Sequence, residues 1–292
     1  MSVPSLSHDS EYDLLDTFTD REHVLDLFKG SLHSAPPGRF HLIAVKGNSG
    51  TGKTFLIEYL ARRVCPSLGW RTGQLTFAQS IPDFRIILEG LEDALRGCIP
   101  RESLKQYRKR RNDFNRSFDE YRASITINQT VEAREYASLS EINQSVQFNA
   151  ELRRRELQLR TELCRALVEL AEECERPLCL FIDGYERMAE NDQELVGWLW
   201  EDVMLKLVQS DPQPFLIVTC GWEWPSSPVI QPFTESSELD DFDVAQMRNY
   251  LHKQGLLLVN SPVSTQEELI TVFYDLTKGL CWLRAPCHAC MD

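Results

Sequence analysis

The sequence predicts an α/β protein in which a parallel β-sheet lies between two layers of helices. Short apolar runs, each about as long as one buried strand, alternate along the 292 residues with segments whose apolar residues recur at helical spacing. A glycine-rich stretch at residues 47–54 follows the first of these runs, and a later run, residues 178–183, ends in an acid. Such alternation is typical of a three-layer fold, and the chain is long enough to bury a sizeable core.

The glycine-rich stretch fully matches the pattern G-x-x-x-x-G-K-[ST], since it reads Gly47-Asn48-Ser49-Gly50-Thr51-Gly52-Lys53-Thr54. Its glycines let the backbone aim successive N–H groups into one nest that holds phosphate oxygens. Lys53 supplies a charge for the β and γ phosphates, Thr54 has a hydroxyl placed to bind Mg²⁺, and the following helix turns its positive end toward the phosphates. The stretch therefore predicts a phosphate-binding loop (P-loop, or Walker A motif), and we count Phe55 with its nucleotide-binding residues.

The segments on either side of the P-loop are those that such a loop requires. Residues 40–45 form an apolar run short enough to be a buried parallel strand, and apolar residues recur at helical spacing from Phe55 to Val64. Strand, loop and helix therefore come in the required order. This order argues against a glycine-rich turn that merely precedes a lysine.

The remaining elements of the first half follow from local patterns. Residues 1–15 predict a flexible polar lead, and a helix is predicted from about residue 18, with Asp20 as its N-cap and its end near Gly30. After the P-loop helix, residues 70–77 predict a second strand and residues 81–97 a helix.

A helical insertion is expected at about residues 84–150. The pattern is weakest beyond residue 100, where residues 124–131 alternate like a strand in polar surroundings. A long helix is then predicted at about 150–175, closed by Pro177. Its leucine stripe favours burial in the core, with heptad pairing to a partner as the alternative.

The third strand, residues 178–183, supplies the second half of the predicted site. An aspartate at the carboxyl end of a buried strand is costly unless it meets a cation, and beside a P-loop that cation is Mg²⁺. We therefore predict that Asp183 and Thr54 hold the metal. Glu186 is either a general base for the attacking water or a helix-start residue favoured by the helix dipole. Glu186 and Lys53 are the predicted catalytic residues.

The last third of the chain predicts one more strand and a lid. Residues 214–220 form the fourth apolar run, and Thr219 near its end either contacts the γ phosphate or is merely structural. Beyond Pro232 we expect the alternation of strand and helix to stop. Two short helices, at about 243–255 with Asp243 as its cap and at about 265–277, predict a small helical lid. We therefore divide the chain into a P-loop domain (16–232) and a lid with a tail (233–292).

Composition and charge exclude several classes of protein. No apolar run approaches the 18 or so residues that cross a bilayer, and the first residues lack the features of a signal peptide, so we expect a cytoplasmic protein. Nine scattered cysteines predict buried reduced thiols rather than disulfides. Cys287 and Cys290 have metal-like spacing, but a frayed tail is favoured there.

Net charge argues against a protein whose main surface binds nucleic acid. The chain carries a net charge of −13, which repels a polyanion. One stretch, residues 101–122, is locally basic around Arg108-Lys109-Arg110-Arg111. Such a run is more often a solvated helix face than a nucleic-acid site, so we expect weak binding at most.

Three motifs together resemble the STAND ATPases, which are related to AAA+ proteins and include modules grouped with origin-recognition-like AAA domains. Residues 18–22 resemble the family's F-x-[GD]-R-E box, residues 47–54 are the P-loop, and residues 183–187 are similar to its D-T-[YF]-E-R motif. Thr277-Lys278-Gly279-Leu280 is similar to its T-x-G-x-P turn without the proline. The resemblance covers about residues 16–285.

The resemblance implies an ATP-driven switch with nucleotide between sheet and lid, Arg21 near the adenine, and ATP-dependent self-association or binding of a protein partner. Two departures from the family bear on its rate. Trp222 stands where members often have an arginine sensor, and Gly184 stands where many AAA+ proteins have a glutamate directly after the Mg²⁺ aspartate. Both departures predict slow hydrolysis.

The leading hypothesis is thus an ATP- and Mg²⁺-binding switch that hydrolyses ATP slowly. The alternative is an interaction scaffold that stays bound to ATP without turnover. A GTPase is disfavoured because the sequence has no N-K-x-D or T-K-x-D box to read guanine. A small-molecule kinase shares the P-loop but needs an acceptor pocket that the sequence does not identify.

Overall fold

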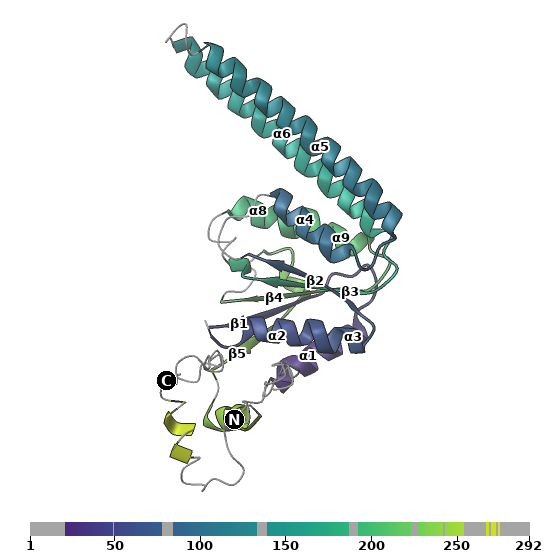
Figure 1. The fold of residues 1–292 in the computed structure, drawn as a ribbon, viewed down its shortest axis with the longest axis vertical. Coiled ribbons are helices and arrows are strands. Elements are labelled where there is room, and N and C mark those ends of the chain that lie inside the picture. The colour runs from purple at the N-terminus through teal and green to yellow at the C-terminus, as the bar shows by residue number, and fades with distance from the viewer. Residues whose placement is uncertain are drawn as a thin grey trace, which may run out of the picture.

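The fold is seen in a computed structural model, which describes residues 21–48, 50–77, 84–132, 139–186, 192–222, 227–241 and 243–253, together with 267, 268, 270–272 and 274 (Figure 1). The lead predicted at residues 1–15 lies outside these residues, as does the predicted cap Asp20.

Five parallel strands form the central sheet, in the order β2-β3-β4-β1-β5. Their bounds are β1 (Leu42–Gly47), β2 (Arg71–Thr76), β3 (Leu178–Asp183), β4 (Phe215–Gly221) and β5 (Thr234–Leu239). All neighbours pair in parallel, so the carboxyl ends of the strands lie along one edge of the sheet. The strand predicted at 178–183 is confirmed at both ends, and the other three predicted strands are confirmed with shifted ends.

Helices cover both faces of this sheet (Figure 1). One face carries α1 (Glu22–Ser34), α2 (Lys53–Tyr59), η2 (Leu60–Val64) and α3 (Cys65–Ser67). The other face carries α4 (Phe84–Leu95), α8 (Gln193–Gly197), η3 (Trp198–Met204) and α9 (Leu205–Ser210). The predicted three-layer α/β architecture is therefore confirmed.

The strands feed two apolar cores, one on each face. In β3, Leu180 and Ile182 belong to the core shared with α4 and α9, whereas Cys179 and Phe181 belong to the core shared with α1 and α2. Side chains of a strand point alternately to its two faces, so this division follows from the continuous apolar sequence of β3. In the described part of the chain, six cysteines are buried and free, as predicted: Cys65, Cys98, Cys164, Cys174, Cys179 and Cys220.

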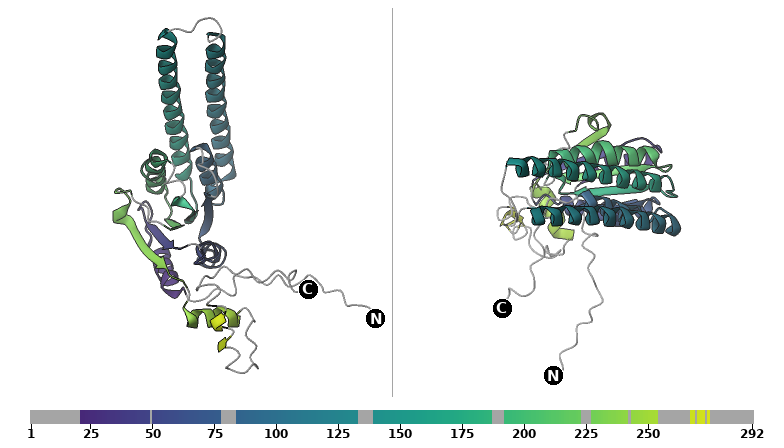
Figure 2. Two further views of the ribbon diagram at one scale, coloured as in Figure 1. Left: turned by 90° about the vertical axis from the view of Figure 1, so that its left-hand side faces the viewer. Right: turned by 90° about the horizontal axis from the view of Figure 1, so that it is seen from above.

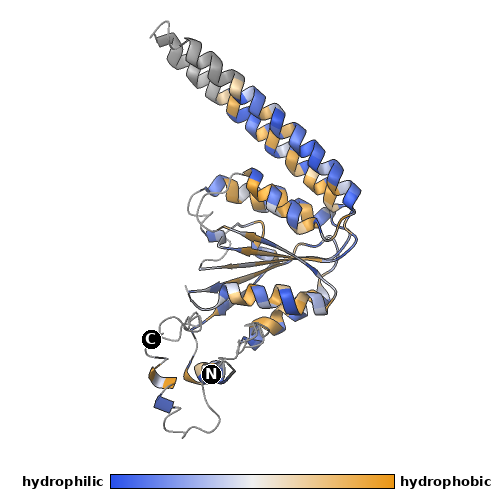
Figure 3. Ribbon diagram, in the orientation of Figure 1, coloured by the Kyte–Doolittle hydropathy of each residue, from blue (hydrophilic) through white to orange (hydrophobic). Residues whose placement is uncertain are grey.

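Two long helices, α5 (Arg101–Glu132) and α6 (Leu139–Ala171), form an antiparallel hairpin that projects from the domain (Figures 1 and 2). Hydrophobic residues recur along the coloured parts of both helices (Figure 3), and those near the domain, among them Leu104, Tyr107, Leu159 and Leu163, belong to its buried core. The strand-like alternation at residues 124–131 is wrong as an indication of β-structure, because this segment continues α5. The helix predicted at 150–175 begins earlier and ends at Ala171. Pairing of two long helices outweighs local strand propensity here.

The basic run of α5 faces acids of the same chain. Arg108 and Arg111 both bind the carboxylate of Glu92 on α4, which is 1% exposed. Arg110 Nη1 lies 2.5 Å from Glu169 Oε2 on α6. The arginines at the centre of residues 101–122 therefore fasten the hairpin to the domain and hold its two helices together. This arrangement favours neither a solvated face nor a nucleic-acid surface for them.

Two expectations about where elements end are corrected. Residues 234–239 form the edge strand β5, so the sheet continues beyond Pro232, where we expected the alternation to stop. The sequence gives no apolar strand pattern here, because Leu239 is the one buried residue of β5. Helix α1 runs past Gly30 to Ser34, since Ser31 and Leu32 extend its buried stripe.

The C-terminal region begins with η4 (Gln231–Phe233) and, after β5, continues in α10 (Val244–Lys253). The predicted cap of α10 is confirmed: the Gln246 N–H donates to Asp243 Oδ1 at 2.8 Å, and the Asp243 N–H donates to Gln246 Oε1 at 2.9 Å. Most of the second lid helix, predicted at 265–277, lies outside the described residues.

Candidate nucleotide site

Three strands bring the predicted site residues to the carboxyl edge of the sheet. β1 ends at Gly47, β3 at Asp183 and β4 at Gly221. The register pairs Lys46 with Gly221 and Asp183 with Cys220. The P-loop and the predicted metal carboxylate therefore meet, although they are far apart in sequence.

The P-loop depends on its glycines for its backbone shape. Gly50 and Gly52 have φ angles of 89° and 90°, in the left-handed region that side chains disfavour. Gly47 leaves no room for a side chain, since a Cβ there would lie 2.6 Å from Thr51 Oγ1 and 2.9 Å from the Leu239 carbonyl oxygen. The loop between Gly47 and α2 is thus built to approach a ligand closely. Asn48 is exposed at its start, and Ser49 lies outside the described residues.

Lys53 begins α2 and folds back over the loop. Its Nζ donates hydrogen bonds to the carbonyl oxygens of Gly47 and Asn48, at 2.6 Å each. Burial lowers the pKa of Lys53, while the negative charges of Glu186 and Asp183 oppose this shift. Lys53 therefore stands within electrostatic reach of both predicted acids.

The predicted metal ligands are in contact. Thr54 Oγ1 donates a hydrogen bond to Asp183 Oδ2 at 3.1 Å, across a sequence separation of 129 residues. A hydroxyl and a carboxylate are hard oxygen ligands of the kind that Mg²⁺ takes, with waters and phosphate oxygens completing its shell. The pair fits that metal. No cluster of three or more His, Cys, Asp or Glu that could hold a metal occurs in the described part of the chain, and Cys287 and Cys290 lie outside it.

Glu186 is buried beside the end of β4, with 3% of its surface exposed. A Cβ on Gly221 would lie only 2.2 Å from Glu186 Oε2, so the absence of a side chain there makes room for the carboxylate. Gly184 has a φ of 73°, and its N–H donates to the Cys220 carbonyl oxygen at 3.2 Å. The chain thus turns sharply after Asp183 in a conformation that suits glycine and disfavours glutamate.

Arg21 supports the P-loop from the side of α1. Its guanidinium is buried, and Nη2 donates to the Thr51 carbonyl oxygen at 3.1 Å. His23 Nε2 lies 3.2 Å from the Glu238 carbonyl oxygen on β5. The start of α1 is therefore fastened both to the loop and to the neighbouring strand, while contact of Arg21 with an adenine stays a prediction.

Two other residues named from the sequence, Phe55 and Thr219, lie on α2 and β4. Phe55 is half-buried on α2, next to the Thr54 hydroxyl in sequence. Thr219 is buried in β4 opposite Ala44 and Ile182. It is on the face of the sheet opposite to that of Val218 and Cys220, which pack with α2, so the structural role is favoured for Thr219.

The sequence identified Gly184 only as a departure from the family's glutamate, and it assigned no role to Gly221. Each directly follows or ends a buried strand at the same edge as the P-loop. A glycine in that position was the available signal, because it marks a sharp turn or a close approach. Trp222, the next residue after β4, is 38% exposed.

One known protein family matches most of the chain. Residues 17–218 match the family described as AAA ATPase domain. The chain belongs to the AAA ATPase domain family. The match includes the P-loop, the strand that ends in Asp183, and Glu186. Membership indicates that this AAA ATPase domain binds ATP. No curated protein matches the chain by sequence.

Solved structures with a similar outline include Drosophila ORC bound to DNA (16% identity, TM-score 0.48, 92% of this chain and 58% of that chain). Others are the Aeropyrum pernix ORC1 protein in complex with DNA (13%, 0.46, 92% and 57%) and a Walker-type ATPase of Pyrococcus abyssi (18%, 0.43, 90% and 65%). The chain thus spans about three-fifths of the length of the two origin-recognition structures. Among the described residues, no helix is long and apolar enough to cross a membrane.

Proposed function

We propose that this AAA ATPase domain is an ATP-binding switch of STAND type that hydrolyses ATP slowly, and whose nucleotide state controls its assembly or its binding to a protein partner. The observation that carries the proposal is the contact of Thr54 with Asp183 beside Lys53. It joins the two halves of a Mg²⁺–nucleotide site at the edge of the sheet where the strands end. Nothing in a merely structural turn requires this pairing.

The binding roles follow from the chemistry of each side chain. The backbone N–H groups of residues 47–54 receive phosphate oxygens, and Lys53 exchanges its carbonyl partners for the β and γ phosphates. Thr54 and Asp183 hold Mg²⁺ directly or through its waters. Bound metal supplies charge neutralisation at the phosphates.

Glu186 is the proposed general base. Its carboxylate is buried at the same edge and acts electrostatically on Lys53, which supports a position near the phosphates rather than a role at a solvent-exposed helix start. It accepts a proton from the attacking water or orients that water. Turnover is slow because Trp222 offers no positive charge where an arginine sensor would stand.

The second candidate is a scaffold that keeps ATP bound without turnover. The exposed Trp222 side chain directly after β4 favours it, since an aromatic ring at that place suits a contact surface better than charge stabilisation. Turnover separates the two functions, and a response of assembly to ATP separates them further.

Calorimetry and single-turnover assays test the proposal. Wild type should bind Mg·ATP in preference to GTP, and Lys53→Ala should remove most of this affinity by deleting the charge that faces the phosphates. Asp183→Ala should weaken Mg·ATP binding and turnover together. Lys46→Ala, on the adjacent strand but outside the loop, is the matched control. Equal affinity of wild type and Lys53→Ala would refute nucleotide binding at this loop.

Assembly is tested by light scattering. Self-association should rise when apo protein is saturated with Mg·ATP, and Lys53→Ala should not respond. An unchanged mass at micromolar concentrations would favour the monomeric scaffold. The cytoplasmic location and weak, salt-sensitive nucleic-acid binding stay predictions.

A further inference from the structure

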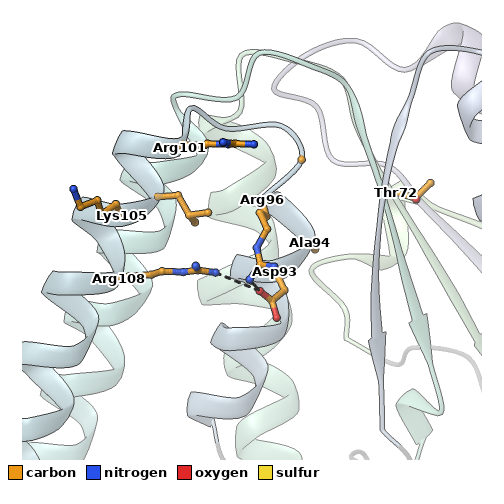
Figure 4. A pocket seen from close by; sticks show the side chains of 9 residues that line it. Thr72, Asp93, Ala94, Arg96, Arg101, Lys105 and Arg108 are labelled. Atoms are coloured by element: carbon orange, nitrogen blue, oxygen red, sulfur yellow. Dashed lines mark hydrogen bonds and ion pairs between the residues drawn. The ribbon is translucent and has the colours of Figure 1, made fainter.

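A second cavity lies away from the nucleotide site, between α4, the start of α5 and strand β2 (Figure 4). Its volume is about 710 Å³, in the range of ligand-binding pockets. Four cationic side chains and one carboxylate line it: Arg96, Arg101, Lys105, Arg108 and Asp93. This excess of positive charge contrasts with the net charge of −13 on the whole chain.

Two of the four cations are held by the domain and two are available. Arg96 Nη2 lies 2.6 Å from Asp93 Oδ1, and Arg108 binds Asp93 and the buried Glu92. Lys105 has only a loose pair with Glu102, 3.9 Å apart, and both side chains are more than two-thirds exposed. No ion pair of Arg101 occurs with the described carboxylates. Arg101 and Lys105 are therefore the cations most able to receive a ligand.

The cations of α5 form a row. Arg101, Lys105 and Arg108 are four and three residues apart, so they lie on one face of the helix at intervals of about 6 and 4.5 Å along its axis. Alternate side chains of an extended peptide recur every 6.8 Å or so. A strand with an acid at every second residue therefore matches Arg101 and Lys105 in charge and comes close to their spacing, whereas the interval from Lys105 to Arg108 is shorter.

The cavity also borders an edge of the sheet, and α4 lies between this edge and the row of cations (Figure 4). Among the described strands, β2 pairs with β3 alone, and the Arg71 and Phe77 N–H groups donate to β3 or to the residues beside it. Thr72, Gln74 and Thr76 therefore turn their backbone groups to the outer side, where no strand of the described chain pairs with them. Thr72 itself lines the cavity. An added strand would find backbone partners on this side.

The geometry points to a docking groove for an extended acidic peptide segment of a protein partner, which adds to the outer edge of β2 and pairs its carboxylates with Arg101 and Lys105. This interaction surface is separate from the nucleotide site and does not depend on the proposed ATPase activity. Single-stranded nucleic acid fits less well, because no aromatic side chain lines the cavity to stack on bases, and the acidic chain repels a long polyanion.

Fluorescence anisotropy with the full chain tests the proposal. The probe is a labelled short peptide in which Glu alternates with Thr, and all samples contain saturating Mg·ATP so that the P-loop offers no anion site. Arg101→Glu/Lys105→Glu should weaken binding about tenfold or more, since each attraction becomes a repulsion. Lys109→Glu/Arg116→Glu makes the same change of charge on α5 outside the cavity and should leave binding within about twofold.

Two further peptides separate strand addition from simple charge attraction, and they need no variant. A peptide with N-methyl groups at alternate residues, which cannot pair with an edge strand, should bind much more weakly. A peptide of the same composition with its glutamates in one block should also bind more weakly. Equal binding of these peptides, tighter binding of oligothymidylate of equal charge, no binding of the alternating peptide, or equal effects of the two double variants would each overturn the proposal.

Discussion

The two edges of the sheet are built differently. At the carboxyl edge, the nucleotide site is made of a short glycine-rich loop, one buried acid and a few hydrogen bonds to backbone carbonyls. At the amino edge, where α4 ends and the hairpin begins, arginines of α5 meet carboxylates of α4 and α6. Polar groups at the first edge surround the candidate nucleotide site, whereas most of the arginines at the second edge pair with carboxylates of the chain itself.

This difference teaches how to interpret charge in the sequence. Lys53, the single lysine of the P-loop, lies near the predicted site residues Asp183 and Glu186. The much more basic run in α5 is instead largely neutralised by carboxylates of its own chain. The number of charges is therefore a poor guide to a binding site, and the location of their partners decides. Experiments at each edge can test whether the charged groups there serve ligand binding or the stability of the fold.

The largest expected effect is on chemistry at the carboxyl edge. Glu186→Gln should reduce single-turnover hydrolysis by about 10²- to 10⁴-fold while Mg·ATP affinity stays close to that of wild type, because the amide cannot accept a proton. Glu201→Gln is a control of the same kind away from the edge. Hydrolysis by Glu186→Gln at the wild-type rate would show that Glu186 is only a helix-start residue.

At the hairpin base, Glu92→Gln should lower the free energy of unfolding by about 3 kcal/mol, because two guanidinium groups lose a buried carboxylate. Urea unfolding measures the effect. Glu102→Gln, whose ion pair is exposed, should change stability by about 0.5 kcal/mol or less. A loss of Mg·ATP affinity in Glu92→Gln would break the contrast between the edges.

Asp211, the residue after α9, should make the stability of the domain depend on pH. Burial raises the pKa of Asp211 to about 6, although the Gln213 N–H donates to its Oδ1. The folded protein therefore holds the proton more tightly than the unfolded chain, so this contribution to stability is full below about pH 4 and is lost as the pH rises through about 6. Asp211→Asn should remove this pH-dependent loss of folding stability, which is on the order of 2 kcal/mol. Thermal unfolding from pH 4 to 7 measures it, with Asp113→Asn as the exposed control.

The smallest expected effect returns to the nucleotide edge. Gly221→Ala places a Cβ where the Glu186 carboxylate lies, and the flexible side chain should move aside. Hydrolysis should fall about tenfold from this misplacement, with little change in ATP affinity or stability. Gly197→Ala, with open space around its Cβ position, is the matched control. Unchanged hydrolysis in Gly221→Ala would separate Glu186 from the chemistry.

Much of the fold and the P-loop contacts could be predicted because their signals are local. A buried parallel strand is apolar throughout, and the P-loop has a fixed spacing of glycines, so both can be recognised from a few consecutive residues. The contact of Thr54 with Asp183 was predictable from the rule that strands of a parallel sheet end at one edge.

What escaped prediction depends on distant partners. Most side chains of β5 are exposed or half-buried, so its sequence is polar and its pairing with β1 is what identifies it as a strand. The length of α5 and α6 comes from their mutual packing, which no single helix encodes. The placement of Glu186 depends on the bare backbone of Gly221, a contact between two different strand ends.

Helix α4 connects the two edges, since it starts on the side where β2 ends and carries Glu92 near its other end. The arm attached there is long: 32 residues of α5 extend for about 48 Å. By simple trigonometry, a rotation of about 5° at its base moves its far end by about 4 Å over that length. If the hairpin follows α4 as a rigid body, a small tilt of α4 displaces the far end of the hairpin by about 4 Å, at a point remote from the candidate nucleotide site.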